Sequence, residues 1–184
     1  MAIFSTVEII KQIKAVDNGQ TFKLVGGAAQ IARLLDMENI NQEHMPFCGV
    51  VPSEGQTTDN EALNGTWQTL TEYFNCVIIL DNTRNNLDTA GQTCVVDFYE
   101  CRDALFKCIY NWNPSFNITK PISFDGYELD SLTVSRIVYK ATFKCEITIS
   151  SDDGYQSPQF PDWGIDKVEV DADPVIGSNH LITE

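Results

Sequence analysis

Residues 93–114 read TCVVDFYECRDALFKCIYNWNP and constrain the fold more than any other stretch. In a helix, apolar side chains spaced alternately by four and three residues fall on one face. That spacing recurs here at Cys94, Phe98, Cys101, Leu105, Cys108 and Trp112. A stripe of this kind has to be buried, so we predict a long helix over about residues 90–112 as the central element of the core. Its expected core anchors are Phe98, Cys101, Leu105 and Trp112.

Both ends of this helix are marked in the sequence. Thr89 and Gln92 have the spacing of a capping box at its start. Pro114 disfavours helical geometry in the residue before it and is expected to end the helix. The helix would then have about five to six turns at ~3.6 residues per turn, enough to lie across a sheet.

The cysteines are expected to be free thiols in the core. Cys94, Cys101 and Cys108 are spaced seven residues apart, a rise of about 10.5 Å in a helix, which is too long for a disulfide. The other three lie in apolar, strand-like segments, and no spacing of cysteine and histidine suits a metal. We therefore expect no metal and no cofactor.

Length and charge limit the possible classes of function. With 184 residues, 43% of them apolar, the chain can build one good core. The 26 acidic and 12 basic residues give a net charge of -14, so a surface that binds DNA phosphates is not expected. No apolar run reaches the roughly 18 residues of a membrane span, and residues 1–14 lack the order of a signal peptide. We expect synthesis in the cytoplasm and no membrane partner.

Residues 1–150 should form one domain of the α/β (α+β) class. Ser5 caps a first helix that ends at residues 17–19, and a second helix follows the Gly26-Gly27 turn at residues 28–37. Residues 53–65 are polar and should form an exposed loop. Period-two alternation or short apolar runs predict the strands: residues 21–25, 45–52, 66–81, 118–124, 127–132 and 136–149. The expected architecture is a mixed, largely antiparallel sheet with two to three helices packed on it.

Two regions are candidates for contact with other subunits. The strand at residues 66–81 begins with polar residues and with Trp67 and Gln68, so its first half should project as a ribbon. Residues 151–184 form an acidic extension with eight acidic residues against one lysine. The apolar side chains in that extension that we expect to dock on a partner are Tyr155, Phe160 and Trp163.

No set of residues specifies a reaction. His44 lies in a turn and His180 in the terminal tail, where surface positions are more usual than a catalytic triad or a metal site. Residues 152–154 resemble the start of a calcium loop but lack its ligand pattern and closing Glu. We therefore predict that the protein is not an enzyme.

Four short motifs follow one another along the chain. They are Val-Gly-Gly-Ala-Ala, Pro-Phe-x-x-Val-Val-Pro, Gln-x-x-x-Glu-x-Phe-x-x-Val-Ile and Arg-x-Ala-Leu-x-x-x-Ile-x-x-Trp-x-Pro, at residues 25–29, 46–52, 68–78 and 102–114. Their order, within about residues 5–149, resembles the tail terminator, or tail completion, proteins of long-tailed bacteriophages. The chain departs from the family pattern at Asn111, where a glycine usually precedes the tryptophan.

The resemblance implies a structural virion protein. Such a protein caps the tail tube as a ring, expected to be a hexamer, ends tube polymerisation and provides the surface for joining the head. The implied partners are further copies of the chain, the tail tube protein and a neck protein, while DNA passes through without specific binding. The alternatives are another head-tail connector or neck component and, from a different class, a small carboxylate-based enzyme.

Overall fold

Two long strands whose residues alternate in polarity, β3 (Trp67–Asp81) and β5 (Arg136–Ser150), form the framework of the fold. They pair in antiparallel register over their whole length. β2 (Phe47–Thr57) lies beside β3, β4 (Ile118–Leu132) lies beside β5, and the short β1 (Leu24–Gly26) runs parallel to β2. The sheet order is β1-β2-β3-β5-β4, and the predicted mixed, largely antiparallel α+β architecture is confirmed.

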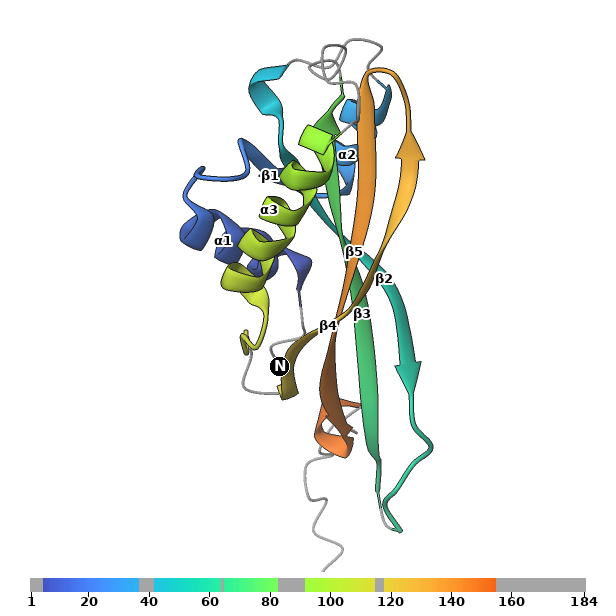
Figure 1. Cartoon of the computed structure of the whole chain (residues 1–184). Coiled ribbons are helices and arrows are strands. Elements are labelled where there is room, and N and C mark those ends of the chain that lie inside the picture. The colour runs from blue at the N-terminus through green and yellow to red at the C-terminus, as the bar shows by residue number, and fades with distance from the viewer. Residues whose placement is uncertain (1–4, 37–41, 64, 83–91, 115–117, 155–184) are drawn as a thin grey trace, which may run out of the picture. The chain divides into compact units, whose positions relative to one another are not determined.

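Three helices cover this sheet unequally (Figure 1). α1 (Thr6–Asp17) and α3 (Gln92–Ile109) lie side by side over one face, whereas α2 (Ala28–Asp36) packs against the other. Two short 3-10 helices, η1 (Gln42–His44) and η3 (Ser151–Asp153), complete the elements of the described part. The prediction that the long helix is the central element was wrong, because β3 and β5 occupy the centre and α3 lies on one face of them.

The computed structural model describes five stretches of the chain: residues 5–36, 42–63, 65–82, 92–114 and 118–154. They all belong to one compact unit, Met1–Gly154. Among these residues, no helix combines the length and the apolar character needed to cross a membrane. Thr89 of the predicted capping box lies outside them.

The end of α3 is set by Asn111 and not by Pro114. The helix stops at Ile109, earlier than predicted, and Asn111 adopts a φ of 60°, in the left-handed region. Glycine and asparagine are the residues that most easily occupy this region after a helix. The chain then pairs with β4, since the Asn111 amide donates to the Ile122 carbonyl (2.8 Å) and the Ile122 amide donates to the Trp112 carbonyl (3.0 Å).

β-Bulges account for two errors in the predicted strands. The separate strands expected at residues 118–124 and 127–132 are one strand, because β4 continues between them with a shift in its register against β5 between Phe124 and Gly126. The loop expected at residues 53–65 begins later, because β2 continues to Thr57 with a register shift between Pro52 and Gly55. A bulge absorbs an extra residue without ending the ladder, so turn-forming residues did not break these strands.

A buried carboxylate explains why β1 is shorter than predicted. Asp17 is only 6% exposed, and its side chain accepts hydrogen bonds from the backbone amides of Thr21 (3.1 Å) and Phe22 (3.0 Å). Those amides are therefore unavailable to a strand, and β1 starts at Leu24 instead of at residue 21.

α3 supplies much of the larger of two core clusters. Phe98, Cys101 and Leu105 are each no more than 1% exposed and belong to this cluster. The Phe98 ring stacks on Tyr139 with 4.0 Å between the ring centroids. Trp112 lies beyond the helix end, half-buried, and packs against the same cluster.

Replacing Leu105 by Ala should lower the free energy of unfolding by ~2–5 kcal/mol, because a fully buried side chain would leave a cavity. Denaturant unfolding measures this change. Lys107→Ala, two residues further along α3 at an exposed position, is the matched control and should change stability by less than ~0.5 kcal/mol. An unchanged midpoint for Leu105→Ala would contradict the core role of α3.

The core also contains free thiols. In the described part, the buried cysteines are Cys48, Cys76, Cys101, Cys108 and Cys145. A hydrogen bond to Cys76, together with burial, raises the pKa of the Cys48 thiol. Burial raises the pKa of Cys108 to about 11 and that of Cys145 to about 12. The fold therefore holds these side chains in their neutral form.

The free energy of unfolding should fall as the pH rises above about 9. The Cys145 pKa is 9.0 in its ordinary state and about 12 in the fold. The contribution of this thiol to the free energy of unfolding is therefore complete below pH 9 and is lost progressively towards pH 12. Urea unfolding at about pH 8 and about pH 10 measures the loss. Cys145→Ala should make it smaller, and an equal loss in both proteins would show that this thiol is not responsible.

Candidate interaction surface

The hairpin of β2 and β3 extends beyond the three α-helices. The second half of β3 is buried and its first half is half-exposed, while β2 changes from buried to exposed after Val51. Figure 1 shows the hairpin running away from α1 and α3 to an end that lies clear of them. We call its described outer part, residues 52–63 and 65–70, the arm.

One side chain closes the end of the arm. The Oδ1 of Asn60 accepts hydrogen bonds from the backbone amides of Trp67 (2.8 Å) and Ala62 (3.3 Å). Its Nδ2 donates to the carbonyl of Gly65 (2.9 Å). An asparagine suits this position because its amide group both accepts and donates. The described end of the arm is therefore a loop, as its polar composition predicted, but it begins only after Thr57 and is held together by Asn60.

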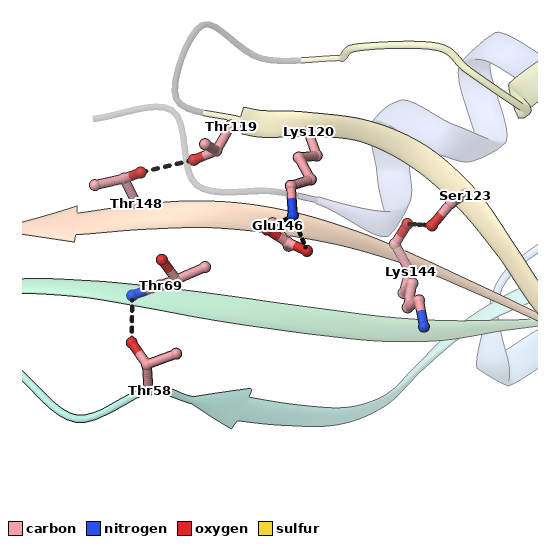
Figure 2. A network of polar contacts seen from close by, with 8 residues as sticks. All are labelled: Thr58, Thr69, Thr119, Lys120, Ser123, Lys144, Glu146 and Thr148. Atoms are coloured by element: carbon pink, nitrogen blue, oxygen red, sulfur yellow. Dashed lines mark hydrogen bonds and ion pairs between the residues drawn. The ribbon is translucent and has the colours of Figure 1, made fainter.

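The two sides of the arm are joined by further hydrogen bonds. The Thr69 amide donates to the Thr58 hydroxyl (3.0 Å), as Figure 2 shows. Gln68, which was predicted to contact another subunit, donates from Nε2 to the Thr58 carbonyl (3.1 Å). The Gln68 side chain is thus used within the arm.

The arm presents apolar and acidic side chains to solvent. Leu63 is fully exposed and Trp67 is 51% exposed. The charged residues of the arm are all acidic and exposed, namely Glu54, Asp59 and Glu61, and no lysine or arginine occurs between residues 52 and 70. Large exposed apolar side chains on a projection contribute little to the stability of their own subunit, so Leu63 and Trp67 are candidates for contact with another chain.

On the sheet face formed by β4 and β5, polar side chains of the two strands pair with one another. Figure 2 shows Lys120 bonded to Glu146, with 2.8 Å between Nζ and Oε2, and the hydroxyls of Thr119 and Thr148 lie 2.6 Å apart. The three lysines on these strands each have a carboxylate partner: Lys120 with Glu146, Lys140 with Asp130 and Lys144 with Asp125. The hydrogen bonds that Lys140 donates to Asp130 and Lys144 donates to Asp125 raise the pKa of both lysines. The edge strand β4 is thereby tied to β5.

A shallow hollow of about 430 Å³ lies beside Trp67 and includes Thr148, Asp152 and Asp153 in its lining. The Asp153 carboxylate accepts from the amide (2.9 Å) and hydroxyl (3.2 Å) of Ser150, so it stabilises the start of η3. Among the described residues, no group of three His, Cys, Asp or Glu side chains could hold a metal ion. The arm is therefore the better candidate for a functional surface.

The predicted contact residues divide into three groups. Trp67 lies on the arm with half of its side chain exposed, Gln68 is used inside the arm, and Tyr155, Phe160 and Trp163 lie outside the described residues. Comparison of the sequence with protein-family models and with characterised proteins finds no match.

Replacing Asn60 by Ala should loosen the end of the arm without changing the core. The Trp67 amide loses its acceptor, and its hydrogen exchange should accelerate by at least about tenfold, or ~1.4 kcal/mol of local stability. The global denaturation midpoint should stay the same. Asn60→Asp is the control, because it keeps the acceptor oxygen and loses only the Nδ2 donor. Equal exchange in wild type and Asn60→Ala would contradict the role given to Asn60.

Proposed function

We propose that the protein is a structural component of a phage virion. It caps the tail tube as a ring, ends polymerisation of the tube and provides the surface to which the head is joined. The observation that carries this proposal is the arm, an ordered hairpin end with Leu63 and Trp67 exposed and with no role in the core of its own subunit. A projecting surface of this kind suits a subunit that assembles with its neighbours.

The helix-end motif at residues 102–114 supports the same proposal. Its apolar members Ala104, Leu105 and Ile109 are buried in the core. Asn111, which stands where the family pattern has glycine, has a φ of 60°. That conformation suits glycine best and asparagine next best, so the departure from the family pattern keeps the same backbone geometry.

The proposed partners are further copies of the chain, as a hexamer on the virion, the tail tube protein and a neck protein on the head side. An arm that meets a different surface of the next subunit makes a heterologous contact, which closes into a ring when the rotation between subunits permits. The net charge of -14 suits a lumen through which DNA passes without specific binding. In this proposal the chain acts at the head-proximal end of the tail, after synthesis in the host cytoplasm, and needs no cofactor.

Cryo-electron microscopy of virions that contain this chain tests the proposal. A reconstruction of the head-proximal end of the tail should contain a closed ring of its copies between tube and neck, with a neutral or acidic lumen. Tails assembled without the protein should be longer than wild-type tails, because nothing would stop the tube. Absence of the chain from that position, or a strongly basic lumen, would overturn the proposal, and a copy bound on the portal side would identify a neck component instead.

A further inference from the structure

The unpaired positive charge of the described part lies away from the sheet face of β4 and β5. All three lysines on those strands have carboxylate partners. In contrast, Lys11 and Lys14 on α1 and Lys107 on α3 are exposed, and no described carboxylate lies within ion-pair distance of them. These lysines are available to a negatively charged partner.

The two lysines of α1 share a stripe with an exposed apolar residue. Val7, Lys11 and Lys14 are spaced by four and three residues and so lie on one side of the helix. Val7 is 54% exposed, while Ile9 and Ile13 on the other side are fully buried. The stripe therefore faces away from the core.

α3 touches α1 beside this stripe and carries a third exposed lysine, Lys107. The Nε2 of Gln12 donates to the carbonyl of Cys108 (3.3 Å), so the two helices touch at these residues. Lys11 and Lys107 are their immediate neighbours in sequence. α1 and α3 also lie side by side in Figure 1. Glu100 and Asp103 are exposed on the same side of α3 as Lys107, so we give the name basic face only to the stripe of Val7, Lys11 and Lys14.

The arm is chemically complementary to the basic face. It offers three exposed carboxylates and one fully exposed leucine, against two exposed lysines and one exposed valine. Two copies with a charge of -14 each repel one another. Because charges are screened beyond about 8 Å at physiological salt, opposite charges have to lie close together to offset that repulsion. An orientation that joins the acidic arm to the basic face does so.

We propose that the arm of one copy docks on the basic face of the next copy, with Leu63 beside Val7 and the arm carboxylates beside the lysines. The arm does not contact the basic face of its own subunit, because the paired strands carry it away from α1 and α3 (Figure 1). The contact joins two different surfaces and is therefore heterologous. The inference rests on the proposed ring, since it names the surface on which the subunits of that ring meet.

Charge exchange between two variants tests this contact. The arm variant Asp59→Lys/Glu61→Lys and the face variant Lys11→Glu/Lys14→Glu alter exposed side chains that make no hydrogen bond or ion pair in the described part. Each variant alone should self-associate at least about tenfold more weakly than wild type, because like charges then meet. Their equimolar mixture should recover wild-type association, since each arm finds a face of opposite charge. Sedimentation velocity over a wide concentration range measures this, and circular dichroism checks the fold.

Two control variants test whether a weaker association is specific to the basic face and to Leu63. Lys23→Glu/Arg33→Glu changes two exposed cations outside the basic face and should associate like wild type. Leu63→Ser should weaken association, whereas Val134→Ser, at an exposed position between β4 and β5, should leave it unchanged.

The possible outcomes decide between the inference and the proposed function. A wild-type chain that stays monomeric at every concentration, or a mixture no better than its components, overturns the inference. If virions carry the ring but the charge exchange has no effect, the inference fails and the proposed function stands. If the exchange works but the tail end holds no copy, the proposed function fails and the contact between copies remains.

Discussion

The fold depends on the unbroken pairing of β3 with β5. Their pairing brings Phe74 opposite Phe143 in the buried part and Trp67 opposite Ser150 at the outer end, with no register shift between. Since side chains alternate between the faces of a sheet, this register places Cys76 opposite Ala141 on one face and Ile79 opposite Val138 on the other. The apolar half gives α1, α2 and α3 a surface to pack on. The other half extends into solvent as part of the arm. The core and the arm therefore lie at opposite ends of the same pair of strands.

Period-two alternation made this ladder predictable. The strands expected at residues 66–81 and 136–149 agree within one residue with β3 and β5. The stripe of α3 was equally visible, but a stripe shows only that a helix face is buried and not which element lies at the centre. The end of α3 depended on the left-handed conformation of Asn111, whereas Pro114 was the stronger signal in the sequence. Loops were predicted at polar segments because a bulge depends on the partner strand and cannot be recognised from one strand alone.

The arm was predicted in part, and the missing part has a physical reason. An exposed Trp67 at the start of a long strand marked the projection, and this could be read from the sequence. The role of Asn60 could not, because its partners are backbone groups that come within reach only once the hairpin register is fixed. The net charge of -14 likewise did not show how the charges are distributed over the surface. Cross-strand pairs neutralise the lysines of β4 and β5, and this leaves the positive charge of α1 and the end of α3 exposed.

Both edges of the sheet are poor templates for strand addition, which favours assembly through side chains of the arm. The register of β4 against β5 shifts at several places, and β4 is tied down by ion pairs. β2 continues beyond Gly49, where its pairing with β1 ends, but Pro52 lacks an amide donor and a bulge follows it. A neighbour adding backbone hydrogen bonds would have to match these irregularities, whereas a docked leucine with flanking charges would not. Such contacts are weak singly and gain strength when every subunit of a closed ring engages two neighbours at once. In the proposed ring, contacts of this kind would leave dilute subunits largely separate and would join them at high concentration or on the end of the tube.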